Sequence, residues 1–297
     1  MRKIILDTDI GSDIDDCFAL AYLLSRKDVE VLGITTVSGA PEMRARLADK
    51  ICSAYGKSVP VCVGCEESLS GEVLQPRLTK AQTAVALSNE KTFSKENTAL
   101  RFMKAVIEEN PGEITLVCIG QLTNAATLFS EYPHIPDLLG ETVIMGGRYA
   151  ENEFCNIEKW GETEWNILCD IKAAQIVFDK CVKNCTVIGV EQTCRFSRPP
   201  ALIKNAFKKR RDGKVVADCI NTTVDEVYFH DVLAVYSCLF PDEVTFKRGR
   251  IKVEVCGETG NAKTVFEPSN GGGCSLVTDF LPEKFFENYK DTVGIEV

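Results

Sequence analysis

The chain has 297 residues, of which 45% are hydrophobic, so it can bury a sizeable core in one or two domains. Its 34 Lys and Arg residues against 43 Asp and Glu residues give a formal net charge of −9. A negative field repels phosphate backbones and anionic lipid surfaces, so we expect neither nucleic acid nor membrane as a partner. Because no apolar run approaches the roughly 20 residues that span a bilayer, we expect a mature, soluble, cytoplasmic protein.

The 14 cysteines do not indicate a disulfide-stapled module. Several of them, such as Cys17, Cys118 and Cys238, lie within apolar segments, where a reduced thiol behaves as a small hydrophobic side chain. The chain has only two histidines, so a Cys/His metal site is poorly supplied with ligands. We therefore expect reduced core thiols.

The first two thirds of the chain alternate short apolar runs with amphipathic segments. The expected strands are 4–7, 29–35, 59–63, 114–119, 141–145 and 186–190, and the expected helices are 16–25, 41–55, 98–109, 123–129 and 172–178. The run 114–119 is continuously apolar, which is typical of a strand covered on both faces. This alternation predicts an α/β fold: an open, doubly wound, mainly parallel sheet with helices on both faces.

The last third has a different pattern. Segments 195–211 and 215–240 are helical in character and predict a helical cap over one edge, at about 195–240. Segments 250–255 and 263–266 predict a late β-hairpin, because turn residues lie between them. We expect one domain, 1–297, in which 70–96 is a mobile insertion because it lacks a sustained apolar period.

The densest chemical signal follows the first expected strand. Five carboxylates occur within ten residues: Asp7, Asp9, Asp13, Asp15 and Asp16. Ligands of doubly wound folds bind outside the carboxyl ends of strands, and carboxylates crowded there repel one another unless a cation or shared protons offset the charge. Oxygen ligands favour calcium or magnesium over zinc. Acids placed at a helix start to match its dipole would explain Asp15 and Asp16, but not Asp7 and Asp9.

Two further groups carry candidate chemistry. His230 and Asp231 begin the apolar run 232–239, where Asp231 could complete an oxygen cage while the imidazole faces a substrate as a general acid. A purely structural histidine is the alternative. Glu164 and Asn166 occupy alternate positions of an expected extended segment, so their side chains would point the same way toward sugar hydroxyls. An ordinary surface loop is the alternative there.

Together these segments resemble the inosine-uridine-preferring nucleoside hydrolase family over most of the chain. The Asp-rich turn, the run 115–124, Met145-Gly146-Gly147, Glu164-Trp165-Asn166 and His230-Asp231 occur in the family's order and approximate spacing. The resemblance implies calcium-dependent hydrolysis of the N-glycosidic bond of ribonucleosides, giving free base and ribose. It also implies a small-molecule nucleoside as substrate and a homodimer or homotetramer.

The resemblance assigns roles to individual residues. It implies a calcium ion held by Asp9, Asp16, Asp231 and the backbone carbonyl of Ile119, with Asp13 a possible further ligand. It implies catalytic roles for Asp9, Asp15 and His230, with an aspartate of the first cluster as the base. It implies ribose contacts from Asp15, Glu164, Asn166 and either Asn156 or Glu158.

The chain also departs from the family pattern. Asp13 and Ile14 amount to two extra residues in the Asp-rich turn, so Asp13 could take the base or ligand role of Asp15 or Asp9. Ala40 stands where the family usually has a ribose-side asparagine, and a His-Gly-x-x-Gly-Leu stretch near 70–90 is missing. Two alternatives therefore stay open: a hydrolase of another N-riboside or glycoside on the same fold, and a non-catalytic nucleoside- or ribose-binding protein.

Overall fold

The computed structural model describes residues 1–155, 162–180, 183–256, 261–271 and 273–297. Its main sheet has nine strands in the order β10-β9-β11-β6-β5-β4-β1-β2-β3. Their bounds are β1 Arg2–Thr8, β2 Val29–Thr36, β3 Val61–Val63, β4 Ile114–Cys118, β5 Glu141–Met145, β6 Cys185–Ile188, β9 Val244–Cys256, β10 Asn261–Pro268 and β11 Cys274–Phe280. Neighbouring strands pair in parallel along the series β3-β2-β1-β4-β5-β6-β11. Strand β9 pairs antiparallel with both β11 and β10. The predicted open, mainly parallel sheet is confirmed.

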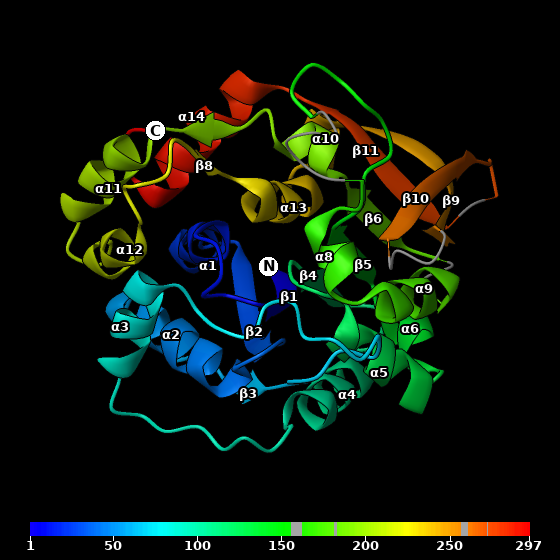
Figure 1. The fold of residues 1–297 in the computed structure, drawn as a ribbon, viewed down its shortest axis with the longest axis horizontal. Helices are drawn as coiled ribbons and strands as arrows, with labels where there is room; N and C mark the ends of the chain where they lie inside the picture. The colour runs from blue at the N-terminus through cyan, green and yellow to red at the C-terminus, as the bar shows by residue number, and fades with distance from the viewer. Residues whose placement is uncertain (156–161, 181–182, 257–260, 272) are drawn as a thin grey trace.

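Helices cover both faces of the sheet (Figure 1). One face carries α1 Asp15–Ser25, α2 Pro41–Ala54, α13 His230–Leu239 and α14 Pro282–Val293, and the other carries α4 Ala99–Glu109, α5 Thr123–Glu131, α6 Ile135–Leu138 and α9 Ile171–Lys180. Side chains of β1 alternate between the two: Ile4 and Leu6 join the core under α1, and Ile5 joins the core under α4. Alternate residues of a strand point to opposite faces, so one strand supplies both cores.

The segments after residue 195 differ in detail from the prediction. They comprise α11 Pro200–Lys208, α12 Lys214–Cys219 and α13, together with a small antiparallel pair, β7 Ser197–Arg198 and β8 Val227–Tyr228. Helix α13 is not part of a surface cap, because it is mostly buried and packs against α1, β5 and β6. The predicted hairpin is confirmed as β9 and β10, although turn residues 257–260 lie outside the described residues.

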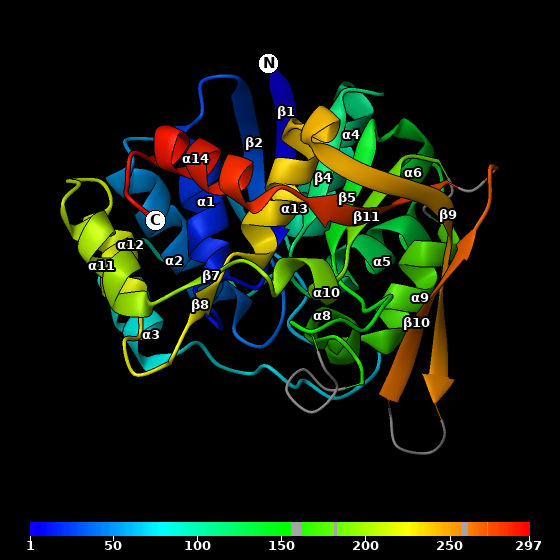
Figure 2. The same ribbon diagram turned by 90° about the horizontal axis from the view of Figure 1, so that it is seen from above.

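The sequence prediction omitted several elements. They are α6, β7, β8, β11 and α14, together with α3 Lys80–Leu87 within the expected insertion, α8 Trp165–Cys169, α10 Val190–Thr193 and the 3-10 helix Pro241–Glu243. Figure 2 shows α8 and α10 at one end of the parallel strands, which is the end that carries the Asp-rich turn. Among the described helices, none has the length and apolar character needed to cross a lipid bilayer.

The guanidinium of Arg44 holds the Asp-rich turn between β1 and α1 in place. Arg44 of α2 is completely buried and donates to the backbone carbonyl of Asp9 and to the Ser12 hydroxyl, the latter at 2.7 Å. It also donates to the carbonyls of Ser38, at 2.8 Å, and Gln75, at 2.9 Å. One fixed fork of donors therefore joins three separate chain segments around the turn.

The backbone conformation of the Asp-rich turn requires a glycine at position 11. Its φ is +121°, a conformation that other residues rarely adopt, and a Cβ there would lie 2.4 Å from Cγ of Leu78. The Gly11 carbonyl accepts a hydrogen bond from the Thr79 amide at 2.8 Å. The turn is thus packed against segment 75–79 as well as against Arg44.

We expect Arg44→Met to lower the free energy of unfolding by about 3 kcal/mol, because it removes the buried charge and leaves carbonyl acceptors without donors. Arg44→Lys should recover only part of the loss, since an ammonium cannot span three segments. The measurement is chemical denaturation. Arg101→Met, which removes an exposed ion pair with Glu96, is the control and should cost less than about 1 kcal/mol. Equal midpoints for Arg44→Met and the wild type would contradict this role.

Candidate functional site

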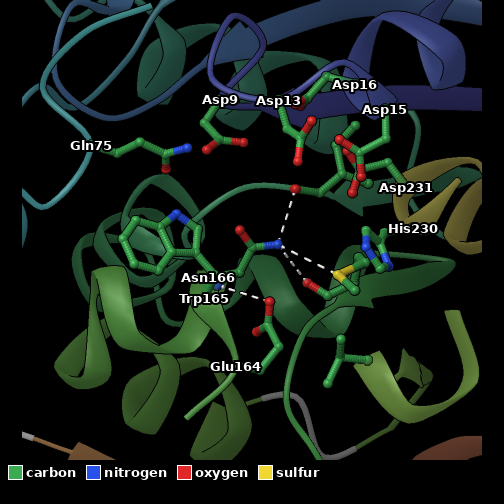
Figure 3. A pocket seen from close by; sticks show the side chains of 13 residues that line it. Asp9, Asp13, Asp15, Asp16, Gln75, Glu164, Trp165, Asn166, His230 and Asp231 are labelled. Atoms are coloured by element: carbon green, nitrogen blue, oxygen red, sulfur yellow. Dashed lines mark hydrogen bonds between the residues drawn. The ribbon is translucent and has the colours of Figure 1, made fainter. Parts of the chain in front are cut away.

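A cavity of about 160 Å³ opens at the carboxyl ends of the parallel strands (Figure 3). Its lining residues are Asp9, Asp13, Asp15, Asp16, Gln75, Ile119, Met145, Glu164, Trp165, Asn166, Val190, His230 and Asp231. Nine of these are residues that sequence reasoning selected, and the fold brings them together from the turn after β1, from α1, from the residue after β4, and from the starts of α8 and α13. The candidates Asn156 and Glu158 lie outside the described residues.

Three buried carboxylates form the tightest group in the cavity. Asp15, Asp16 and Asp231 each offer an oxygen within 4.8 Å of the others. Asp16 accepts a hydrogen bond from the Thr8 hydroxyl. The three residues stand in the first turns of α1 and α13, where helix dipoles favour negative charge.

Burial raises the pKa of Asp15, Asp16 and Asp231 well above the usual carboxyl range, and repulsion from neighbouring aspartates raises it further. The chemistry of this donor set fits a hard cation. It offers only oxygen ligands, and its charges need compensation beyond the opposing field of Arg44. In the described part of the chain, these residues could hold a divalent cation, with calcium and magnesium favoured over zinc.

Asp9 lies in the same cavity but outside that group of three. Burial raises its pKa, while the Arg44 guanidinium and a hydrogen bond with the Gln75 side chain oppose the rise. Gly120 follows β4 and makes room for Asp9, because a Cβ at Gly120 would lie 2.8 Å from the Asp9 amide nitrogen and Oδ1. Asp9 is therefore a separately held carboxylate facing the cavity beside the cluster.

Asp7 belongs to the Asp-rich segment but not to the cavity. It is buried, and one of its oxygens accepts hydrogen bonds from the Thr35 hydroxyl and the Asn124 amide, the latter at 2.7 Å. Burial raises its pKa to about 7. Its contacts join β1 to β2 and α5, so Asp7 supports the end of the strand.

The expectation that Glu164 and Asn166 lie on an extended segment is wrong. Glu164 is the N-cap of α8, and its carboxylate accepts hydrogen bonds from the backbone amides of Asn166, at 2.9 Å, and Ile167, at 3.2 Å. A carboxylate satisfies the otherwise unpaired amides of a first helical turn, which is why the segment coils here. Both side chains nevertheless line the cavity.

Asn166 also hydrogen-bonds to the backbone carbonyl of Ile119, which the sequence analysis proposed as a calcium ligand. Its side-chain amide donates to the carbonyls of Ile119 and Met145, each at 3.1 Å. Burial raises the pKa of Glu164 to about 7, and the negative charge of Asp9 adds to the rise. The floor of the cavity therefore presents one carboxylate and one amide, both held by backbone groups.

His230 stands at the opposite wall. Its Nδ1 lies 2.6 Å from the Thr193 hydroxyl of α10, and its ring stacks on Tyr228 with centroids 5.1 Å apart. Burial lowers the pKa of His230 to about 3, so the ring is neutral at neutral pH. A neutral imidazole is a weak proton donor, and the contacts with Thr193 and Tyr228 fix the orientation of the ring.

Sequence reasoning missed three residues that shape the site: Arg44, Gln75 and Thr193. Gln75 lines the cavity within the segment that lacks an apolar period, and Thr193 follows β6 in a four-residue helix. No local pattern marks any of them, because each reaches the site only through the packing of distant segments. Thr8, by contrast, could have been found from the sequence, because it stands between Asp7 and Asp9.

Comparison with known proteins places the chain in a family. The family model of inosine-uridine preferring nucleoside hydrolase matches residues 4–287. Uridine nucleosidase 1 of Arabidopsis thaliana is 30% identical over 86% of this chain and 79% of its own length. The inosine-uridine preferring nucleoside hydrolase of Leishmania major is 30% identical over 90% of this chain and 88% of its own.

A solved structure, the purine-preferring ribonucleoside hydrolase of Gardnerella vaginalis, has the same fold, with a TM-score of 0.80 at 22% identity over 98% of each chain. The chain therefore belongs to the inosine-uridine preferring nucleoside hydrolase family, whose members are N-glycosyl hydrolases.

Proposed function

We propose that this protein hydrolyses the N-glycosidic bond of ribonucleosides in a calcium-dependent reaction that gives free base and ribose. The observation that carries the proposal is the meeting, in one cavity, of the Asp15, Asp16 and Asp231 group with Glu164 and Asn166. Cation ligands and sugar-binding groups are thus adjacent, as hydrolysis of a riboside requires. The names of the relatives in Arabidopsis thaliana and Leishmania major support a nucleoside as substrate.

The proposed calcium ligands are Asp16 and Asp231 of the observed group, together with Asp9 and the carbonyl of Ile119; Asp15 is close enough to contribute an oxygen. When bound, the ion supplies positive charge that neutralises the carboxylates and makes water a better nucleophile.

The remaining chemistry is assigned to the chain's own side chains. We assign Asp9 as the base that accepts a proton from the attacking water, since it faces the cavity beside the cation group. Asp15, Glu164 and Asn166 hold the ribose hydroxyls. Positive charge develops on the sugar as the bond breaks, and the surrounding carboxylates stabilise it. His230 lies against the leaving base.

Asp16→Asn should reduce turnover of nucleosides by about 10³-fold or more, because weakened cation binding removes several kcal/mol of charge stabilisation in the transition state. Ribose release from a panel of purine, pyrimidine and modified ribosides is the measurement. Asp291→Asn, at an exposed position of α14, is the matched control and should keep wild-type rates.

Unchanged activity of Asp16→Asn would exclude the proposed cation site. Turnover of a modified riboside alone would favour the alternative glycoside. Tight nucleoside binding without ribose release would favour the non-catalytic binding protein.

The cation should stabilise the fold more at higher pH. Because the pKa values of Asp15, Asp16 and Asp231 are raised in the folded state, the cation-free fold holds protons that the unfolded chain has released. Its stability therefore falls as the pH rises above about 4, the usual aspartate range. Bound calcium takes the place of those protons.

The difference in melting temperature between calcium-loaded and EGTA-treated protein should accordingly grow from pH 5 to pH 8. Magnesium should give a smaller difference, since it demands stricter octahedral geometry. A difference that does not change with pH would contradict cation binding at these three carboxylates.

A further inference from the structure

A second cavity, of about 390 Å³, adjoins the first. Asp13 and His230 line both cavities, so the two meet at these side chains. The second cavity lies between the Asp-rich turn, the start of α3 and the segment that leads into α13. His230, which the proposed function places against the leaving base, therefore borders the second cavity as well as the first.

The charged side chains that line the two cavities are all acidic. Among the described residues that line the two cavities there is no lysine or arginine, and the charged side chains of the second cavity are Asp13 and Glu226. A phosphate or another anionic group would meet only repulsion here. A ligand group that donates hydrogen bonds has complementary chemistry.

The wall around Asp13 is held by its neighbours. Gln82, which is 2% exposed, donates to the Asp13 carbonyl at 2.7 Å, and its own side-chain oxygen accepts from the Cys17 thiol. One Asp13 carboxylate oxygen accepts from the Ile14 amide at 2.7 Å. The Gln82 side chain is thus engaged at both ends, whereas the exposed Asp13 carboxylate lines both cavities and can accept from a ligand.

We propose, on the basis of the nucleoside hydrolase function above, that Asp13 is a specificity-determining residue that selects leaving bases carrying an exocyclic amino group. An amino group donates to the carboxylate, whereas a carbonyl oxygen at the same ring position faces it with like partial charge. Cytidine is therefore preferred over uridine, and adenosine over inosine.

The test compares kcat/KM for these two matched nucleoside pairs. We expect the wild type to favour the amino member of each pair by about 10-fold or more. Asp13→Asn should bring both ratios to within about threefold of one, because an amide donates as well as accepts. Asp225→Asn, at an exposed aspartate near the same segment, is the control and should keep the wild-type ratios.

Calcium affinity distinguishes selection of the base from a role in the cation site. Asp13→Asn should keep the wild-type affinity for calcium, since the proposed ligands are Asp9, Asp16, Asp231 and the carbonyl of Ile119 rather than Asp13. A large loss of affinity would assign Asp13 to the cation and overturn the proposal. Ratios near one in the wild type, or ratios unchanged in Asp13→Asn, would also overturn it.

Binding separates this inference from the proposed function. If the wild type hydrolyses none of the four nucleosides, calorimetry measures their dissociation constants. Tighter binding of cytidine and adenosine that Asp13→Asn abolishes would support selection by Asp13 while overturning the hydrolysis. Equal or absent binding would overturn both.

Discussion

Repulsion among buried carboxylates is the constraint on which the rest of this structure depends. Asp9, Asp15, Asp16 and Asp231 are all buried in one cavity, where burial raises their pKa values and the charges of Asp9 and Asp15 raise those of Asp16 and Asp231 further. Several features offset the repulsion: the Arg44 guanidinium, the Thr8 hydroxyl, and the N-termini of α1 and α13. A bound cation would offset the repulsion further. The packing of distant segments therefore holds these carboxylates close together although they repel one another.

The same distribution of charge suits the chemistry of N-glycosyl hydrolysis. A sugar that becomes cationic as its base departs is stabilised by carboxylates that are already in place and need not reorganise. Glu164 is held by backbone amides and His230 by the Thr193 hydroxyl, so the groups on opposite walls are oriented before a ligand arrives. The elements that hold them, α8 and α10, are short and follow strand ends, where the chain can turn toward the cavity.

The accuracy of sequence-based prediction varied along the chain for physical reasons. Strands such as Ile114–Cys118 were predicted because a strand buried on both faces must be continuously apolar. Helix α14 was missed although Phe285, Tyr289 and Val293 recur at helical spacing and Gly294 has the positive φ of a C-terminal cap. The extended reading of 164–166 failed because a single capping carboxylate decides the local conformation there.

The sequence by itself determined the kind of site: alternating apolar segments specify a parallel sheet, and carboxylates after its first strand specify an oxygen-rich site at the sheet's carboxyl edge. Only the tertiary structure decided which side chains act together. It grouped Asp15 with Asp16 and Asp231, held Asp9 apart, and brought Arg44, Gln75 and Thr193 to the site. The reason is physical: residue type and local period are encoded in neighbouring positions, whereas these contacts join segments that meet only when both cores pack.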